Sequence, residues 1–215
     1  MNSNDIYLLG IGHGTPIFIE LAEACGYHVA GLYHYNSDRT GEVDHGYMIL
    51  GSFGDLLRKD LRGKNFCLTM GDMGIKQAVS SDIIQRGGGV PTLIHPTAII
   101  SRFANVSSCG VLVCSHCEIH NDTTIEAGCV LWPQAMVDHD CHIGEYSFMG
   151  PKSYVGAYTE VESKAFIGQC SVLVSGKAKH IGKEALVGAG SIVVKPVSDK
   201  AIVAGNPARI LKYKP

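Results

Sequence analysis

An aliphatic residue or methionine recurs every six positions through the C-terminal half of this 215-residue chain, and no other feature constrains the fold as strongly. The recurring residues are Ile100, Val106, Val113, Ile119, Ile125, Leu131, Val137, Ile143, Met149, Val155, Val161, Ile167, Leu173, Ile181, Val187 and Val193. Only two intervals depart from six, and the residue two positions before each is mostly small. Because an α-helix repeats every ~3.6 residues, this period predicts a parallel β-helix instead. Six residues form one strand and turn, and three such hexads form a triangular coil.

The first 95 residues follow a different pattern, in which short apolar runs alternate with helical segments. Strands are expected at 6–9, 28–33 and 65–70, and helices at 16–25, 53–59 and 76–87, the first with Thr15 as N-cap. This order predicts a small parallel sheet with helices on its faces, resembling a Rossmann fold. We therefore expect two domains, an α/β domain over 1–95 and a β-helix over 96–215.

The overall charge and the apolar runs exclude several classes of function. The net charge of −2 gives no electrostatic footprint for nucleic acid, so no nucleic-acid partner is expected. We expect no membrane span, because no apolar run has the necessary length, and no signal peptide at the N-terminus. A cytoplasmic location is therefore expected, with the eight cysteines reduced.

The stretch "CSHCEIH" (114–120) suggests a zinc site, but the repeat argues against one. Cys117, Cys129 and Cys141 all fall at the small corner position, where a thiol acts as a buried apolar group. Cys114 directly follows an inward residue and should point outward. Since a zinc site needs four convergent side chains, we expect no metal here.

Asp138, His139 and Asp140 follow the inward Val137 and are expected on an exterior turn. A carboxylate beside an imidazole can orient the ring and raise its basicity. Neutral imidazole, with an ordinary pKa of about 6.5, is suited to accept a proton from an attacking amine. From the residues alone, a solvated charged turn is the competing interpretation.

Four stretches resemble the bacterial left-handed β-helix acyltransferases that acetylate sugars: "GIGHG" (10–14), "HPTAIIS" (95–101), "VDHDCHIGEY" (137–146) and "AIVAGNPARIL" (201–211). That family includes sialic acid O-acetyltransferases and N-acetyltransferases of nucleotide-linked amino sugars. The resemblance implies a left-handed β-helix, a homotrimer, and acetyl-CoA as co-substrate between subunits. It also implies that His139 is the general base and that Asp140 modulates it.

The resemblance further implies the residues that contact acetyl-CoA, namely His142, Phe148, Ala157, Gly168, Gly188 and Ala189. In relatives a histidine nine positions after the base meets the thioester, whereas this chain has Phe148 there. Either a backbone N–H or His142 is expected to replace that contact.

The acceptor is expected to bind to the N-terminal domain. By its residues alone, "GIGHG" is either a phosphate-binding loop or a tight strand-to-helix turn. The resemblance favours binding of the nucleotide of a sugar substrate, at Gly12, His13, Gly14, His34, Tyr35, Gly71 and Asp72. The base stays open between uracil, thymine and guanine.

The leading hypothesis is therefore an acetyl-CoA-dependent N-acetyltransferase acting on a nucleotide-linked amino-deoxy sugar. One alternative is an O-acetyltransferase of a sialic-acid-like sugar. Another, of a different class, is a non-catalytic or metal-binding β-helix protein.

Overall fold

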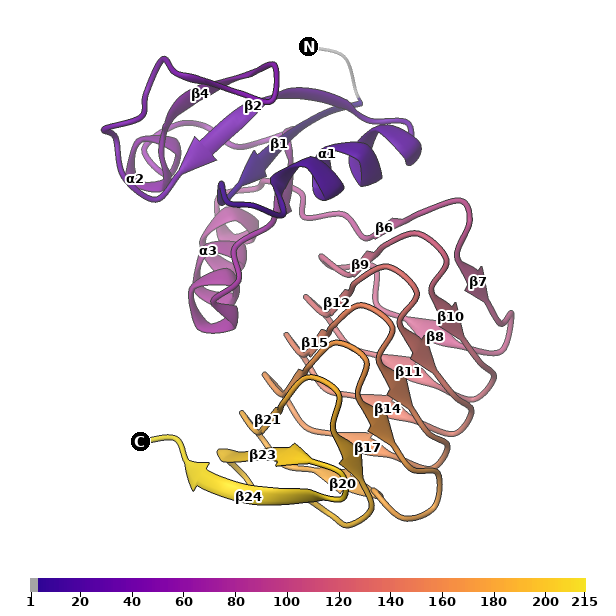
Figure 1. Cartoon of the computed structure of the whole chain (residues 1–215). Helices are drawn as coiled ribbons and strands as arrows, with labels where there is room; N and C mark the ends of the chain where they lie inside the picture. Colours follow the sequence, from indigo (N-terminus) through magenta and orange to yellow (C-terminus); the bar gives the residue numbers. More distant parts are fainter. Residues whose placement is uncertain (1–3) are drawn as a thin grey trace. The chain divides into compact units, whose positions relative to one another are not determined.

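The computed structural model describes residues 4–215, and the chain divides into two compact units, the first ending at Leu93 and the second spanning Ile94–Pro215 (Figure 1). The first unit contains β1 (Asp5–Leu9), α1 (Thr15–Ala24), β2 (His28–His34), β3 (Val43–Asp44), β4 (Tyr47–Ser52), α2 (Phe53–Leu56), β5 (Asn65–Leu68) and α3 (Met73–Gln85). A further short strand, β6 (Leu93–Ile94), lies at the division.

The sheet of the first unit has the strand order β3-β4-β2-β1-β5. Strands β4, β2, β1 and β5 run parallel, and only β3 is antiparallel to its neighbour. A core that includes Leu9, Leu56, Phe66 and Ile83 is buried between strands and helices. The α/β class expected for this region is thus confirmed. Strands β3 and β4 were not expected, because "YMILGS" is short and ends in a glycine and a serine, which favour turns.

The loop between β1 and α1 ends one residue earlier than the sequence suggested. Helix α1 begins at Thr15 itself, with Gly14 at the N-cap, so the expected capping role of Thr15 is wrong. The Thr15 hydroxyl instead accepts a hydrogen bond from the N–H of Gly12 at 2.8 Å. At Gly10, where φ is +103°, a Cβ would lie 2.7 Å from the backbone nitrogen of Met70, so only glycine fits.

The second unit is a parallel β-helix built almost entirely of two-residue strands. They are β7 (Ile99–Ile100), β8 (Asn105–Val106), β9 (Leu112–Val113), β10 (Glu118–Ile119), β11 (Thr124–Ile125), β12 (Val130–Leu131), β13 (Met136–Val137), β14 (His142–Ile143), β15 (Phe148–Met149), β16 (Tyr154–Val155), β17 (Glu160–Val161), β18 (Phe166–Ile167), β19 (Val172–Leu173), β20 (His180–Ile181), β21 (Leu186–Val187) and β22 (Ile192–Val193). A hairpin of β23 (Ala201–Gly205) and β24 (Ala208–Tyr213) follows them.

Three sheets form the faces of this β-helix. Face 1 has the order β22-β19-β16-β13-β10-β7, face 2 has β20-β17-β14-β11-β8, and face 3 has β24-β23-β21-β18-β15-β12-β9-β6. The chain visits faces 1, 2 and 3 in turn, and the five strands of face 2 correspond to the roughly five coils expected. The recurring aliphatic residues are buried, except Ile100 and Val106, which are half-buried because β7 and β8 end their sheets.

From the turn between β9 and β10 to the turn between β21 and β22, each turn closes on a residue in the left-handed backbone region, again with a period of six. These residues are His116, Asp122, Gly128, Gln134, Asp140, Tyr146, Lys152, Tyr158, Lys164, Cys170 and Gly176, and the series resumes at Glu184 and Gly190 after the long interval. Non-glycine residues adopt this conformation at a cost, which the stacked coils must offset. The repeat therefore fixes the backbone of Asp140, which has a φ of 54°.

The cysteines at the corners bond from coil to coil. The thiols of Cys117, Cys129 and Cys141 donate to the carbonyl oxygens of Trp132, Gly144 and Gly156, at 3.1, 3.2 and 3.3 Å. Burial raises the pKa of Cys117 and of Cys141 to about 11. The expected inward placement of these three residues is confirmed. The expected outward placement of Cys114 is wrong, since it is buried.

Within residues 4–215, no helix is both long and apolar enough to cross a membrane.

Candidate active site

His139 and Asp140 form a paired imidazole and carboxylate on the turn between β13 and β14. Nδ1 of His139 lies 2.8 Å from Oδ2 of Asp140, and both side chains are partly exposed. The left-handed conformation of Asp140 gives the turn its sharp bend. The structure therefore places these two residues on the exterior, as the position of Val137 predicts.

The carboxylates around His139 favour its charged form. The hydrogen bond with Asp140 raises the pKa of His139 above its ordinary value, and the charges of Asp138, Asp140 and Asp122 act in the same direction against partial burial. When Nδ1–H donates to Asp140, the other ring nitrogen, Nε2, carries the lone pair. Nε2 lies 4.0 Å from Oδ1 of Asp138, beyond hydrogen-bonding distance, so it is available to accept a proton.

An aromatic ring and a shallow hollow adjoin this pair. The ring of Tyr158, one coil later, meets the His139 ring edge-on, with centroids 5.2 Å apart and an angle of 89°. An open hollow of about 340 Å³ lies beside them. Its lining residues are Asp122, Thr124, Asp140, Cys141, His142, Tyr158, Thr159 and Glu160.

Asp138 holds the turn from the other side, a role that the sequence analysis did not assign. Its Oδ1 accepts a hydrogen bond from the backbone N–H of His139 at 2.8 Å and lies 3.1 Å from Nδ1 of His120, and its Oδ2 accepts from the Tyr154 hydroxyl at 2.7 Å. Burial works to raise the pKa of Asp138, but these hydrogen bonds outweigh it and the pKa is lowered. The spacing could have revealed the pair with His120, because a coil of 18 residues makes neighbours of residues 18 apart.

The residues expected to contact acetyl-CoA are distributed over all three faces of one chain. Ala157 lies on the turn after β16, which is one coil beyond the His139 turn, and its N–H donates to the hydroxyl of Ser175. His142 lies on face 2, where its Nε2 is 3.2 Å from Oε1 of Glu126. Phe148, together with Gly168, Gly188 and Ala189, lies on or directly after the strands of face 3. Within one chain, His142 and Phe148 therefore lie on different faces of the β-helix.

Phe148 belongs to an aromatic column on face 3. Its ring stacks on that of Phe166, with centroids 4.7 Å apart and an angle of 7°, and lies 6.0 Å from the ring of Trp132. Gly168 directly follows β18, the strand that carries Phe166. A Cβ at Gly168 would lie 2.6 Å from the backbone nitrogen of Ala189 in the next coil. Glycine at 168 is thus required by the coil stacking itself.

The residues expected to bind the nucleotide gather at the carboxyl edge of the N-terminal sheet. Gly12, His13 and Gly14 follow β1, His34 and Tyr35 end or follow β2, and Gly71 and Asp72 follow β5. The loop after β5 is hydrogen-bonded to the loop after β1, because the Thr69 hydroxyl donates to the carbonyl oxygens of Leu9 and Gly10. Parallel α/β sheets bind ligands at this edge.

The residues at that edge of the sheet differ in exposure and in the hydrogen bonds that they already make. Tyr35 is 71 % exposed and its ring lies 4.0 Å from that of His34, whose Nδ1 is 2.9 Å from Oδ1 of Asn36. The Asp72 carboxylate caps α3 by accepting from the N–H of Ile75. The N–H of Gly12 is engaged by Thr15, but its Cα faces open space, with nothing within 4 Å of an added Cβ.

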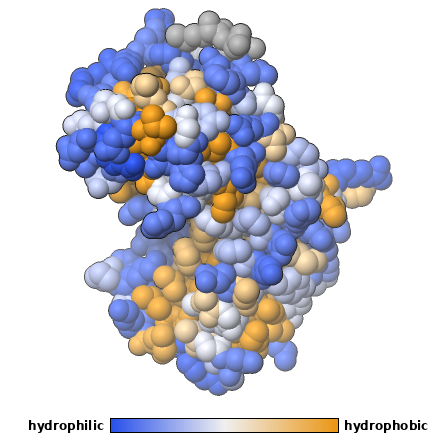
Figure 2. Space-filling model, turned by 45° about the horizontal axis from the view of Figure 1, so that its top comes forward, coloured by the Kyte–Doolittle hydropathy of each residue, from blue (hydrophilic) through white to orange (hydrophobic). Residues whose placement is uncertain are grey.

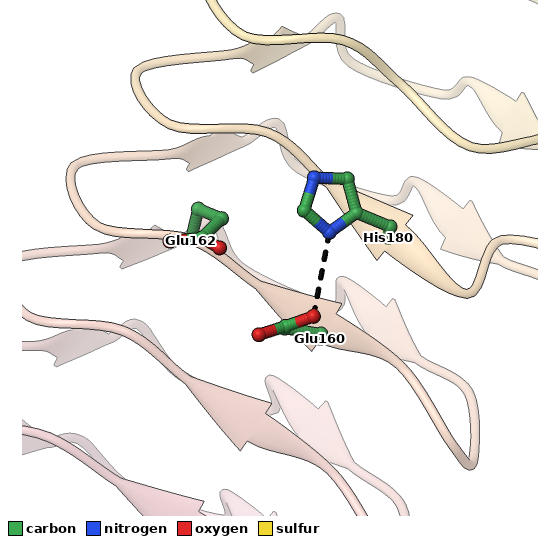
Figure 3. A group of neighbouring side chains, drawn as sticks. All are labelled: Glu160, Glu162 and His180. Carbon is green, nitrogen blue, oxygen red and sulfur yellow. Dashed lines mark hydrogen bonds and ion pairs between the residues drawn. The ribbon is translucent and has the colours of Figure 1, made fainter.

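One group of side chains in the second unit has donor atoms close enough for a metal ion: Glu160, Glu162 and His180 (Figure 3). Their ligand atoms lie within 4.8 Å of one another, and Nδ1 of His180 is 3.5 Å from Oε2 of Glu160. These side chains project from β17, its following turn and β20 on face 2. All three side chains are at least partly exposed, and only His180 and Glu160 are in contact, so the cluster is also what an ordinary solvated surface presents.

Comparison with known proteins agrees with this geometry. A family model described as "Bacterial transferase hexapeptide (six repeats)" matches residues 122–157, a range that includes His139 and Asp140. The GDP-perosamine N-acetyltransferase of Escherichia coli O157:H7 is 28 % identical over 202 residues, which cover 91 % of this chain and 89 % of that protein. The dTDP-3-amino-3,6-dideoxy-alpha-D-galactopyranose 3-N-acetyltransferase of Aneurinibacillus thermoaerophilus is 49 % identical over 55 residues, or 26 % of this chain and 28 % of that one.

A solved structure resembles the chain over both units. PerB from Caulobacter crescentus, crystallised in complex with CoA and GDP-perosamine, is 28 % identical, with a TM-score of 0.87 and coverage of 97 % of each chain. The resemblance expected from the sequence motifs is thus confirmed. Residues 122–157 thus match the hexapeptide repeat of bacterial transferases, and over nearly its full length the chain is similar to N-acetyltransferases that act on GDP-perosamine.

Proposed function

We propose that this protein is an acetyltransferase that moves the acetyl group of acetyl-CoA to the amino group of a nucleotide-linked amino-deoxy sugar. The observation that carries the proposal is the likeness to PerB, because it spans 97 % of both chains and that enzyme was crystallised with both CoA and GDP-perosamine. A likeness limited to the β-helix would support a shared hexapeptide-repeat fold but not a shared substrate.

The chemistry that we assign to the pair at 139 and 140 is general-base catalysis. The sugar amine attacks the thioester carbon, and Nε2 of His139 accepts the proton that the nitrogen loses as the C–N bond forms. The tetrahedral intermediate then collapses, the C–S bond breaks, and CoA leaves as the thiolate or, after protonation by the imidazolium, as the thiol. Asp140 holds the imidazole in the required tautomer and stabilises the imidazolium. No step needs a metal ion, because the imidazole supplies the base.

We assign the nucleotide part of the acceptor to the carboxyl edge of the N-terminal sheet. The open space above Gly12 and the N-terminus of α1 favour a phosphate there, while the exposed Tyr35 ring offers a stacking surface for a base. The domain over residues 1–95 would then bind the nucleotide sugar, and residues 96–215 would carry the reaction.

We further propose that three copies assemble and that the β-helix is left-handed. In one chain, His139 lies between faces 1 and 2, whereas Phe148, Gly168, Gly188 and Ala189 lie at face 3, so a second copy is needed to bring both groups to one acetyl-CoA. Hydrophobic residues also reach the surface (Figure 2), with Ile210, Leu211 and Tyr213 of β24 each more than half exposed. The free cysteines favour a reducing, cytoplasmic setting.

An acetyl-transfer screen tests the proposed function. The purified protein would be incubated with acetyl-CoA and with GDP-linked or dTDP-linked amino sugars, or with free sialic acid, and products would be identified by mass spectrometry. We expect N-acetylation of a nucleotide-linked amino sugar and none of free sialic acid. Acetylation of sialic acid hydroxyls alone, or no transfer to any amino sugar, would contradict the proposal. Light scattering that showed a monomer at micromolar concentration would contradict the trimer.

A further inference from the structure

The turn that carries His139 is fixed by a carboxylate that the proposed reaction does not use. The Asp138 side chain bends back over its own chain, and Oδ1 accepts the backbone N–H of His139 at 2.8 Å. The main chain of Asp138 is itself tied to the next coil, where its N–H donates to the carbonyl oxygen of Val155 at 2.9 Å. This carboxylate therefore constrains the backbone at the residue where the imidazole begins.

Side chains from the coils before and after hold the Asp138 carboxylate in place. The Tyr154 hydroxyl, one coil later, donates to Oδ2 at 2.7 Å, and Nδ1 of His120, one coil earlier, lies 3.1 Å from Oδ1. The Asp138 side chain is only 17 % exposed, whereas Asp140 is 45 % exposed. Three donors converging on one partly buried carboxylate make a far more rigid group than a solvated surface aspartate.

The β-helix does not need a carboxylate at this point of its turn. The residues one coil away, in the same place on the turn, are His120 and Gly156, and both turns are formed without one. Asp138 is thus specific to the coil that carries His139. A purely architectural role would be expected to recur in the neighbouring coils, and it does not.

We propose that Asp138 is a positioning residue for His139, held by Tyr154 and His120 so that the imidazole keeps Nδ1 on Asp140 and presents Nε2 to the reacting amine. This inference rests on the proposed function for its catalytic meaning. Without Asp138, the His139 backbone loses its side-chain acceptor and the ring is free to leave Asp140. A displacement of about 1 Å at a reacting group costs about 100-fold in rate.

The charge of Asp138 has a second, separable effect on the ring. It raises the pKa of His139, together with other groups that face the imidazole from its own turn and from the coils on either side. The titratable groups around the ring and its carboxylates are Asp138, Asp140, Asp122, His120, Tyr154 and Tyr158. Loss of charge should therefore be measured separately from loss of position.

The test combines kinetics with NMR of the His139 ring, assigned by comparison with His139→Ala. We expect Asp138→Asn to lower kcat by about 10–100-fold with little change in either KM, and to lower the pKa of His139. The ring should also lose its single Nδ1–H tautomer. Tyr154→Phe removes one donor and no charge, so it should lower kcat less and disturb the tautomer without the same fall in pKa.

Two matched variants complete the design. Asp122→Asn removes a facing charge whose carboxylate accepts a hydrogen bond from the Asn121 side chain, so it should lower the His139 pKa but keep the tautomer. Asp199→Asn removes a turn carboxylate that accepts the N–H of Lys183 far along the β-helix, and it should leave kcat unchanged.

Wild-type kcat and an undisturbed His139 tautomer in folded Asp138→Asn would overturn the inference. If the wild-type protein transfers no acetyl group, the proposed function fails, whereas the NMR measurement still decides whether Asp138 positions the ring.

Discussion

Nδ1 of His139 lies 2.8 Å from Oδ2 of Asp140, and Asp140 has a left-handed backbone with a φ of 54°. The same backbone recurs in each turn from that between β9 and β10 to that between β21 and β22, so the repeat itself brings the carboxylate to the ring. Aspartate and asparagine tolerate this conformation better than most residues. The turn backbone of the β-helix thereby places the Asp140 carboxylate where it orients the imidazole of His139, to which we assign the chemistry.

Asp140→Asn should therefore change the pH dependence without disturbing the fold. His139 acts as a base only when neutral, and its raised pKa places the acid limb of kcat/KM above pH ~6.5. Removing the Asp140 charge lowers that pKa, so the acid limb should move to lower pH. The plateau rate should also fall, on the order of tenfold, because the ring loses its orienting acceptor. A pH–rate profile identical to that of wild type would contradict the role of Asp140.

Gly168→Ala should destabilise the protein through the stacking of its coils. The added Cβ would lie 2.6 Å from the backbone nitrogen of Ala189, and neither backbone can move without breaking coil-to-coil hydrogen bonds. Overpacking of this kind costs about 1–3 kcal/mol of unfolding free energy. Gly71→Ala is the matched control, because nothing lies within 4 Å of a Cβ there. Chemical denaturation should show a loss for Gly168→Ala alone, and equal stability of the two variants would refute the stacking role.

Cys141→Ser should retain activity, although residue 141 is next to Asp140 in the sequence. The Cys141 thiol is buried, has a pKa raised to about 11, and donates to the carbonyl oxygen of Gly156. Serine occupies the same corner at Ser147, Ser153 and Ser171. We expect kcat within a few-fold of wild type and no acetylated protein in intact-mass spectra after incubation with acetyl-CoA. An acetyl group found on a cysteine during turnover would contradict direct transfer.

Gly12→Val tests the acceptor site. A side chain there would enter open space in this structure, so the fold should tolerate it, whereas a nucleotide bound over the loop would be crowded. The KM for the nucleotide sugar should rise while that for acetyl-CoA stays nearly constant. A parallel rise in both KM values would indicate a general folding defect, and no change in either would remove the loop from the binding site.

The sequence predicted the β-helix well because each inward residue carries its own signal. Val137, Ile143 and Met149 lie six apart, and burial of each follows from its place in the period rather than from distant contacts. The outward placement of His139 and Asp140 followed from the same register.

What the sequence did not reveal depends on neighbours in other coils or strands. Asp138 gains its role from Tyr154 and His120, which are 16 and 18 residues away. Cys114 is buried although it follows an inward residue, so alternation of neighbouring residues fails there. Strand β4 pairs in parallel with β2, and this pairing overrides the turn-forming residues at its end.

The rate of acetyl transfer by His139→Ala between pH 6 and pH 9 tests the central claim most directly. General-base assistance is typically worth about 10²–10⁴-fold, or roughly 3–5 kcal/mol of barrier. We expect kcat to fall by that range at neutral pH, while the protein stays folded, because this partly exposed turn residue contributes little packing. We also expect the loss to shrink toward pH 9, where more of the sugar amine is already neutral. A His139→Ala variant as fast as the wild-type enzyme at neutral pH would show that His139 is not the base.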